Sequence, residues 1–426
     1  MTAGMSQIRK RSRPYAFRRR LLSTVAMIGA VAANIAGTAP AAFAADVQSK
    51  QWYLDAMGAE QIWKTATGKG IKVAVIDSGV NSSTPSLKGQ VQKGLDLTNV
   101  DGEATDDYDG HGTTMAELIA GTGNGGGLRG LAPDAEIIPF RISNDEFESK
   151  GKVNNWDVRD AIKAAADSDA QIISMSSGSD YWIAQDEEAV KYAQSKGKLF
   201  FAGVGNSAKK GNKRQYPASY AEVVGVAASG PDGKVADYSQ HGDFVDIAAP
   251  GNDIPRWCDA NFKRYCDGDG GTSAATAIAS ASAALIWSAH PDWTANQVLR
   301  VMFESAARAE GSKAGTLSNY LGHGVVRPGA HINRGLGKPG DPGLSPLTNT
   351  KVGGGSSGGD SSSASPAPSA PASSQAPKGG SESDAVVTGS SKSTDDGGQL
   401  GLIIGIGAAV VIAVGAFAVI RKRRSA

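Results

Sequence analysis

The segment IKVAVIDSG, residues 71–79, is an almost continuous run of apolar, mostly β-branched residues that ends at Asp77. This composition predicts a strand that is buried on both faces of a parallel sheet. Two amphipathic segments follow, and each leads into another short apolar run. Repeated strand–helix–strand order predicts parallel strands with right-handed crossovers, and therefore an α/β fold. The expected helices span residues 156–166 and 186–196, and the expected strands span residues 172–176 and 198–202.

Polar residues follow several of these predicted strands. Asp77, Ser176 and Asn206 all lie at or just after strand ends. Because ligands bind beyond the carboxyl ends of parallel strands, we expect these residues at one functional edge of the sheet. His111 and Ser273 instead begin predicted helices. Residues from both kinds of element can therefore meet at that edge.

The segment DGGTSAATA, residues 269–277, is typical of a nucleophile at the start of a helix. Ser273 follows two glycines and precedes an apolar stretch at residues 278–286. Glycines permit a sharp turn, and the helix start offers free N–H groups and a positive dipole to an anion. The alternative is that Ser273 is an ordinary helix N-cap.

The chain order Asp77, His111, Ser273 is typical of one kind of catalytic triad. His111 lies in the segment DGHGT, residues 109–113. The order Asp, His, Ser is that of subtilisin rather than that of chymotrypsin or the α/β-hydrolases. In such a triad the serine attacks the scissile carbonyl, the histidine carries its proton, and the aspartate orients the imidazole.

Other residues of the same types compete for two of these roles. His241 and His323 also precede glycine, so the dipeptide His–Gly does not select His111. The position of His111 selects it, because His111 follows a polar loop and begins a predicted helix. Asp246 is a rival acid, but it lies within the apolar run at residues 244–249 rather than at a strand end.

These segments resemble the active-site blocks of the subtilisin-like serine proteases, peptidase family S8. The segment FFAGVGNS, residues 200–207, with YPA at residues 216–218, resembles a fourth block. The likeness covers residues 51–327. It implies a subtilisin-like three-layer α/β sandwich with a mainly parallel central sheet. It also implies a serine endopeptidase that hydrolyses proteins or peptides through an acyl-enzyme.

The resemblance assigns further roles around the triad. The side-chain amide of Asn206 and the backbone N–H of Ser273 would form the oxyanion hole. The alternative for Asn206 is a turn residue. Ser176, Ser177 and Gly178 would pair with the substrate backbone as an added strand. Ser177 stands where a larger apolar residue is expected, which leaves less apolar surface beside the substrate pockets.

Three further features accompany the resemblance. Tyr216–Pro217 resembles the family's cis-proline turn beside the substrate pocket. Four basic residues in the preceding loop would act as a specificity device or form a solvated surface, and both readings stay open. The resemblance implies that the chemistry needs no cofactor. Residues 81–89 lack an acid that helps bind the family's calcium ion, so the sequence does not support a structural calcium. The four basic residues of the loop before Tyr216–Pro217 are Lys209, Lys210, Lys213 and Arg214.

The two cysteines and the two ends of the chain indicate export. Cys258 and Cys266 are expected to form a disulfide, as pairs of cysteines in exported domains usually do. Residues 1–44 have a basic start, an apolar middle and the sequence Ala-Phe-Ala, which predicts a signal peptide cleaved after Ala44. An uncleaved N-terminal anchor is the alternative.

The C-terminal residues 337–426 predict a membrane anchor. Residues 337–399 are rich in Gly, Ser, Pro and Ala and read as a linker that cannot fold. Residues 400–420 carry no charge and are long enough to cross a bilayer as a helix. The basic residues 421–424 place the tail, residues 421–426, in the cytoplasm, so the peptidase domain, residues 45–336, would lie outside the cytoplasmic membrane.

This architecture of signal peptide, peptidase domain, linker, span and basic tail resembles the membrane-anchored mycosins of type VII secretion. The resemblance implies secretion-system components as partners. The chain has 43 Lys and Arg residues and 42 Asp and Glu residues. This balanced charge does not indicate a nucleic-acid partner. Two alternatives stay open: a non-catalytic protein that stabilises a secretion complex, and an acid protease that uses Glu in place of His, which the segment around His111 disfavours.

Overall fold

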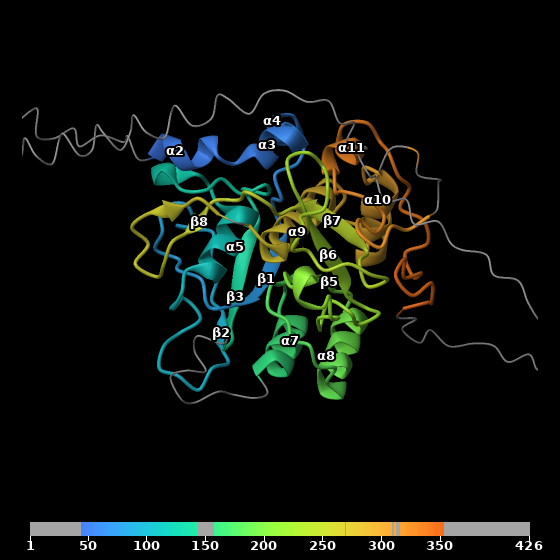
Figure 1. Ribbon diagram of the computed structural model, residues 1–426, viewed down its shortest axis with the longest axis horizontal. Helices are drawn as coiled ribbons and strands as arrows, with labels where there is room; N and C mark the ends of the chain where they lie inside the picture. Colours follow the sequence, from blue (N-terminus) through green and yellow to red (C-terminus); the bar gives the residue numbers. More distant parts are fainter. Residues whose placement is uncertain (1–43, 144–156, 269, 309–310, 312–315, 353–426) are drawn as a thin grey trace, which may run out of the picture. The chain divides into compact units, whose positions relative to one another are not determined.

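A seven-stranded parallel sheet forms the centre of the protein (Figure 1). The computed structural model describes residues 44–143, 157–268, 270–308, 311 and 316–352. The strand order is β2-β3-β1-β4-β5-β6-β7. β1 lies inside the sheet, between β3 and β4, where strands of buried apolar residues are expected. The strands are β1 Lys72–Asp77, β2 Leu95–Asp96, β3 Glu136–Arg141, β4 Ile172–Met175, β5 Leu199–Gly203, β6 Val224–Ser229 and β7 Ile247–Pro250.

Helices cover both faces of this sheet, which gives the three-layer sandwich that the sequence predicts. Helices α7 and α8 pack on one face over alternate apolar residues of the strands, and α5, α9 and α10 pack on the other face. The larger helices are α5 His111–Ala120, α7 Asp157–Asp167, α8 Ala184–Ser195, α9 Thr272–Ala289 and α10 Ala295–Ser305. The shorter ones are α2 Ala44–Ser49, α3 Trp52–Met57, α4 Ala59–Ile62, α11 Pro328–Ile332, and the 3-10 turns Asn124–Gly126 and Ala208–Lys210.

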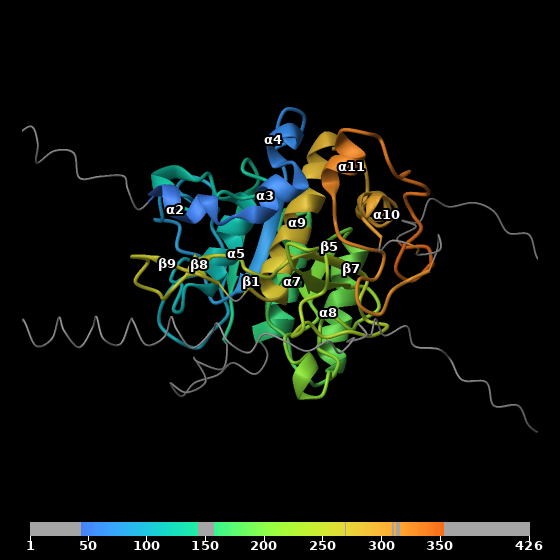
Figure 2. The ribbon, with the colours of Figure 1, turned by 45° about the horizontal axis from the view of Figure 1, so that its top comes forward.

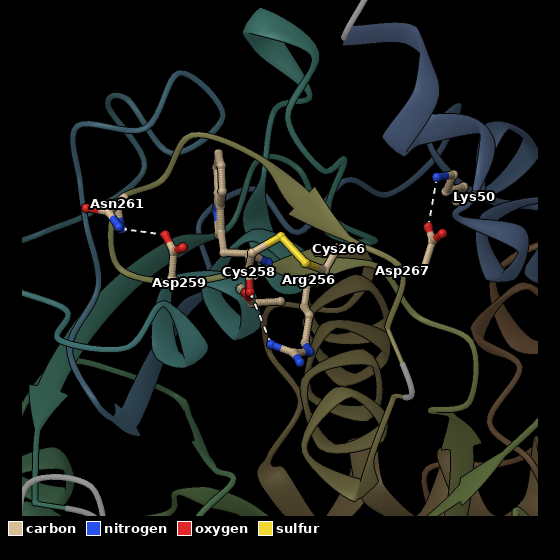
Figure 3. The surroundings of a disulfide bond; sticks show 9 residues. Lys50, Arg256, Cys258, Asp259, Asn261, Cys266 and Asp267 are labelled. Atoms are coloured by element: carbon tan, nitrogen blue, oxygen red, sulfur yellow. Dashed lines mark hydrogen bonds and ion pairs between the residues drawn. A yellow bond between two sulfur atoms is a disulfide. The ribbon is translucent and has the colours of Figure 1, made fainter. Parts of the chain in front are cut away.

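A small antiparallel hairpin adds to the face that carries α5. It consists of β8 Arg256–Trp257 and β9 Tyr265–Cys266. The disulfide expected from the sequence closes it: Cys258 and Cys266 are joined, with Cα atoms 5.0 Å apart. Figure 3 shows this disulfide together with the ion pair between Lys50 and Asp267, which links the hairpin to the segment after α2.

The hairpin is also bonded to α5. The Tyr265 hydroxyl donates to Glu117 Oε2 at 2.7 Å, and the Thr84 hydroxyl donates to Glu117 Oε1 at 2.8 Å. Burial raises the pKa of Glu117 to about 7, although these hydrogen bonds lower it. Because this pKa lies above the ordinary 4.5, the folded chain holds the proton more tightly, and stability falls as pH rises from 4.5 through 7.

We predict that Tyr265→Phe lowers the free energy of unfolding by about 1–3 kcal/mol at pH 8, because an ionised buried carboxylate loses a donor. The deficit should be smaller at pH 5, where Glu117 is protonated. Denaturant titrations at the two pH values measure both. Tyr181→Phe, at a tyrosine that is 76% exposed, is the control. An equal deficit at pH 5 and pH 8 would contradict this account.

One described helix, α9, is long and apolar enough to cross a membrane. It lies inside the protein, with 83% of the apolar window buried, so we assign it to the core. The predicted span at residues 400–420 and the signal peptide up to residue 43 lie outside the described residues. The domain boundaries therefore stay predictions. Residues 337–352, expected in the linker, contact α10: Lys338 N donates to Glu304 Oε2 at 2.8 Å.

Candidate active site

Asp77 and His111 meet at the carboxyl edge of the sheet. Asp77 ends β1 and is buried, while His111 begins α5 and has a side chain that is 38% exposed. His111 Nδ1 and Asp77 Oδ1 are 2.7 Å apart. The close approach depends on Gly112, where a Cβ would come within 2.1 Å of Gly79 O. The buried carboxylate therefore fixes one nitrogen of an imidazole that is partly exposed to solvent.

The acidic surroundings favour the protonated form of His111. Burial alone would lower its pKa, but the charge and hydrogen bond of Asp77, with smaller contributions from Asp109 and Asp107, raise it to about 9. An imidazolium at this position is the species that forms when a histidine accepts a proton from a nucleophile. The arrangement thus stabilises the charge that triad chemistry develops.

The pH profile of activity should report this raised pKa. A histidine can accept a proton only in its neutral form. With His111 as the predicted base, kcat/KM should increase tenfold per pH unit and level off near pH 9 rather than near the ordinary 6.5. Asp109→Asn should shift the rising limb to lower pH because it removes one of the negative charges. Asp101→Asn, at an exposed acid, is the control. A wild-type limb centred at or below 6.5 would contradict the prediction.

Asp107 holds the start of α5, and the sequence analysis did not single it out. Its Oδ1 accepts from Ser78 Oγ at 2.8 Å and Gly110 N at 2.9 Å. Its Oδ2 accepts from Thr113 N at 2.9 Å and from the Thr113 hydroxyl at 2.5 Å. One buried carboxylate therefore ties the segment after β1 to the first turn of α5, where His111 lies.

We predict that Asp107→Ala lowers kcat by about a hundredfold, the loss that follows a misplacement of about 1 Å. KM should change little, because Asp107 does not face a substrate. The rising limb of the pH profile should also shift to lower pH, since the Asp107 charge that helps raise the pKa of His111 is lost. Asp101→Ala is the matched control. A loss of stability with kcat and the pH profile unchanged would show a purely structural role.

Ser273 lies in the first turn of α9, beside Asn206. Asn206 Oδ1 accepts from Thr272 N at 2.9 Å and from the Thr272 hydroxyl at 3.1 Å. Gly205 has a φ of 103°, which favours glycine, and it turns the chain from β5 into this position. The Asn206 amide nitrogen has no acceptor among the described residues. It can therefore donate to an oxyanion beside Ser273.

Ser176, Ser177 and Gly178 follow β4 at the same edge. Ser177 and Gly178 have no backbone hydrogen bond to another described residue, so their backbone groups can pair with an added strand. The next residue, Ser179, exchanges two backbone hydrogen bonds of 2.9 Å with Tyr216. The Tyr216–Pro217 bond is cis, as the resemblance implies.

The basic loop and the rival residues have structural partners. Lys209 pairs with Asp237 and Lys213 with Asp180, each at 3.1 Å, and Arg214 pairs with Asp243. These pairs favour a solvated surface over a specificity device. The rivals of His111 and Asp77 are also engaged elsewhere. His241 stacks on Tyr320, His323 stacks on Phe303, and Asp246 accepts from Gly225 N.

The fold of this chain and its likeness to known serine endopeptidases place it in the class of subtilisin-like serine endopeptidases. The chain matches the Subtilase family, peptidase S8, over residues 68–324, and it belongs to that family.

Several characterised proteases are similar to the chain. Thermitase from Thermoactinomyces vulgaris is 36% identical over 207 residues, which are 48% of this chain and 71% of thermitase. Subtilisin BL from Lederbergia lenta is 32% identical over 61% of this chain and 90% of its own length. The match to a thermophilic serine proteinase from Bacillus sp. (strain AK1), 36% identical, spans 53% of this chain and about half, 54%, of that proteinase.

Solved structures show the same fold. MycP1 from Mycobacterium smegmatis superimposes with a TM-score of 0.59 at 26% identity, over 71% of this chain and 89% of MycP1. MycP3, a protease from the type VII (ESX-3) secretion system, gives a TM-score of 0.56 at 28% identity, over 66% of this chain and 88% of MycP3.

Within the described residues, no group of three His, Cys, Asp or Glu side chains could hold a metal ion. The expectations for calcium and for the absence of a cofactor stay predictions.

Proposed function

We propose that the chain is an exported, membrane-anchored serine endopeptidase that uses Asp77, His111 and Ser273 and serves a type VII secretion system. The hydrogen bond of 2.7 Å between His111 Nδ1 and Asp77 Oδ1 carries the catalytic part of this proposal. It orients the imidazole so that Nε2 is free to act as the base. Ser273, at the start of α9, supplies the nucleophile.

The chemistry follows from these positions. Ser273 Oγ attacks the carbonyl carbon of the scissile bond while its proton passes to His111 Nε2. The negative oxygen of the tetrahedral intermediate accepts hydrogen bonds from the Asn206 side chain and Ser273 N. His111 then gives the proton to the leaving amine, and the C–N bond breaks. Water, deprotonated by His111, cleaves the acyl-enzyme and restores Ser273.

Location and partners rest on different observations. The charge-free residues 400–420 and the basic residues after them support an anchor with the peptidase domain outside the membrane. The structural likeness to MycP1, described as an essential component of the type VII (ESX-1) secretion system, supports secretion-system components as partners. Proteins on the outer side of the membrane would be the substrates.

A membrane-impermeant fluorophosphonate applied to intact cells tests both the site and its location. It should label the full chain and the Ser207→Ala control, and it should not label Ser273→Ala. Labelling only after lysis would reverse the topology. A folded chain that is never labelled would instead support the non-catalytic, stabilising role.

A further inference from the structure

A cavity of about 960 Å³ lies beside the carboxyl ends of β6 and β7. The loop at residues 230–235 forms one side, and α3 and α11 form the other. Figures 1 and 2 both show α11 beside α4, the helix that continues from α3. None of Asp77, His111 and Ser273 lines this cavity, and neither do the substrate-pairing residues. The cavity is therefore lined by residues other than those that the proposed hydrolysis uses.

The floor of the cavity is apolar. Met57, Val235, Leu321 and Val325 line it and are only partly buried. Trp52 forms one wall, and its indole N–H donates to Asn252 O at 3.0 Å. A concave apolar floor with one fixed aromatic wall is typical of a site that accepts apolar groups.

The rim of the cavity is cationic. Arg308, Arg327, Arg334 and Lys234 line it, and no Asp or Glu among the described residues does. Lys234 pairs with Asp232 at 3.2 Å, and Arg327 donates to the Ser305 carbonyl. Arg308 and Arg334 are exposed and have no acidic partner among the described residues. The positive rim is therefore complementary to an anion.

A second cavity adjoins the first, and we refer to the two together as the groove. A second cavity of about 100 Å³ shares Arg308 and Leu321 with the first one. Leu317, which lines this extension, is 60% exposed, and Tyr320, which lines the first cavity, is 52% exposed. Arginines at separate points along an apolar groove fit several carboxylates on an extended chain better than a single headgroup.

We propose that this groove binds an acidic peptide segment of another protein. Carboxylates of the segment pair with the guanidinium groups of Arg308 and Arg334, since arginine binds carboxylates through two parallel hydrogen bonds. Alternate apolar side chains of the segment enter the cavity over Leu321 and Val325. The proposal is independent of the hydrolytic function, because it assigns the groove to a partner rather than to a substrate.

Binding of a defined probe tests the groove. The full chain carrying Ser273→Ala, in mild detergent, is titrated into a fluorescein-labelled six-residue peptide of alternating glutamate and leucine, and anisotropy is measured. Arg308→Gln/Arg334→Gln should weaken binding about tenfold. Lys263→Gln/Arg264→Gln removes the same charge from exposed residues of the β8–β9 hairpin. This matched control should change the Kd less than about twofold.

Three results would overturn the proposal. The first is equal binding by the two double variants. The second is equal binding of a peptide with serine in place of leucine, which would show charge attraction alone. The third is binding of phosphatidylglycerol vesicles that depends on Arg308 and Arg334 while peptide binding does not, which would assign the groove to lipid. Hydrolysis of a reporter peptide by Arg308→Gln/Arg334→Gln with Ser273 intact should equal that of the unmodified chain, and this equality confirms folding.

Discussion

Ser273→Ala should abolish peptide hydrolysis, with a fall in kcat on the order of 10⁶-fold, the size of loss known for the equivalent change in subtilisin. The reason is that only the Ser273 hydroxyl can form the acyl-enzyme in the proposed mechanism. His111 and Asp77 remain in place but have no proton to transfer. Steady-state hydrolysis of a fluorogenic peptide by the purified chain measures the change.

The same substitution should leave the fold intact. Ser273 is only partly buried, and its hydroxyl has no hydrogen-bond partner among the described residues. The free energy of unfolding should therefore change by less than about 0.5 kcal/mol. Ser207→Ala, which removes an exposed hydroxyl beside Asn206, controls for the loss of a serine. Hydrolysis by Ser273→Ala at the unmodified rate would remove Ser273 from the mechanism.

The sequence predicts the centre of the fold because each element there has a clear apolar pattern. β1 is apolar along its length and buried on both faces, and α7 has a clear apolar stripe, so both are found within one or two residues of their bounds. β3 is missed. Its run contains Pro139, which argues against a central strand, yet β3 pairs with both β1 and β2. The pairing of β3 with β1 and β2 in the folded protein makes it a strand.

Some residues of the candidate site can also be predicted from the sequence, and others cannot. Asp77, His111 and Ser273 stand in local sequence blocks, so their roles can be predicted. Asp107 resembles any acid of a polar loop. Four of its five hydrogen bonds come from residues 109–113, and only the one from Ser78 Oγ joins a segment that the fold brings to it. The cationic groove is assembled from residues as distant as Trp52 and Arg334. No local sequence pattern predicts a surface of this kind.

Asn206→Ala should lower kcat by about 10²–10³-fold with little change in KM, the effect known for the oxyanion donor of subtilisin. The side-chain amide would meet the developing oxyanion rather than the ground-state carbonyl, so its loss affects the transition state. Steady-state kinetics with the same fluorogenic peptide separate kcat from KM. Ser207→Ala is again the matched control, at the neighbouring exposed residue.

A second substitution separates this role from a structural one. Asn206 Oδ1 also accepts from Thr272 N at 2.9 Å, so Asn206→Ala removes a hydrogen bond at the start of α9 as well as the donor. Asn206→Asp keeps that acceptor but replaces the amide donor with a negative charge next to the oxyanion. If the donor is what matters, Asn206→Asp should lose at least as much kcat as Asn206→Ala. Recovery of kcat by Asn206→Asp would instead show that Asn206 acts only by holding Thr272.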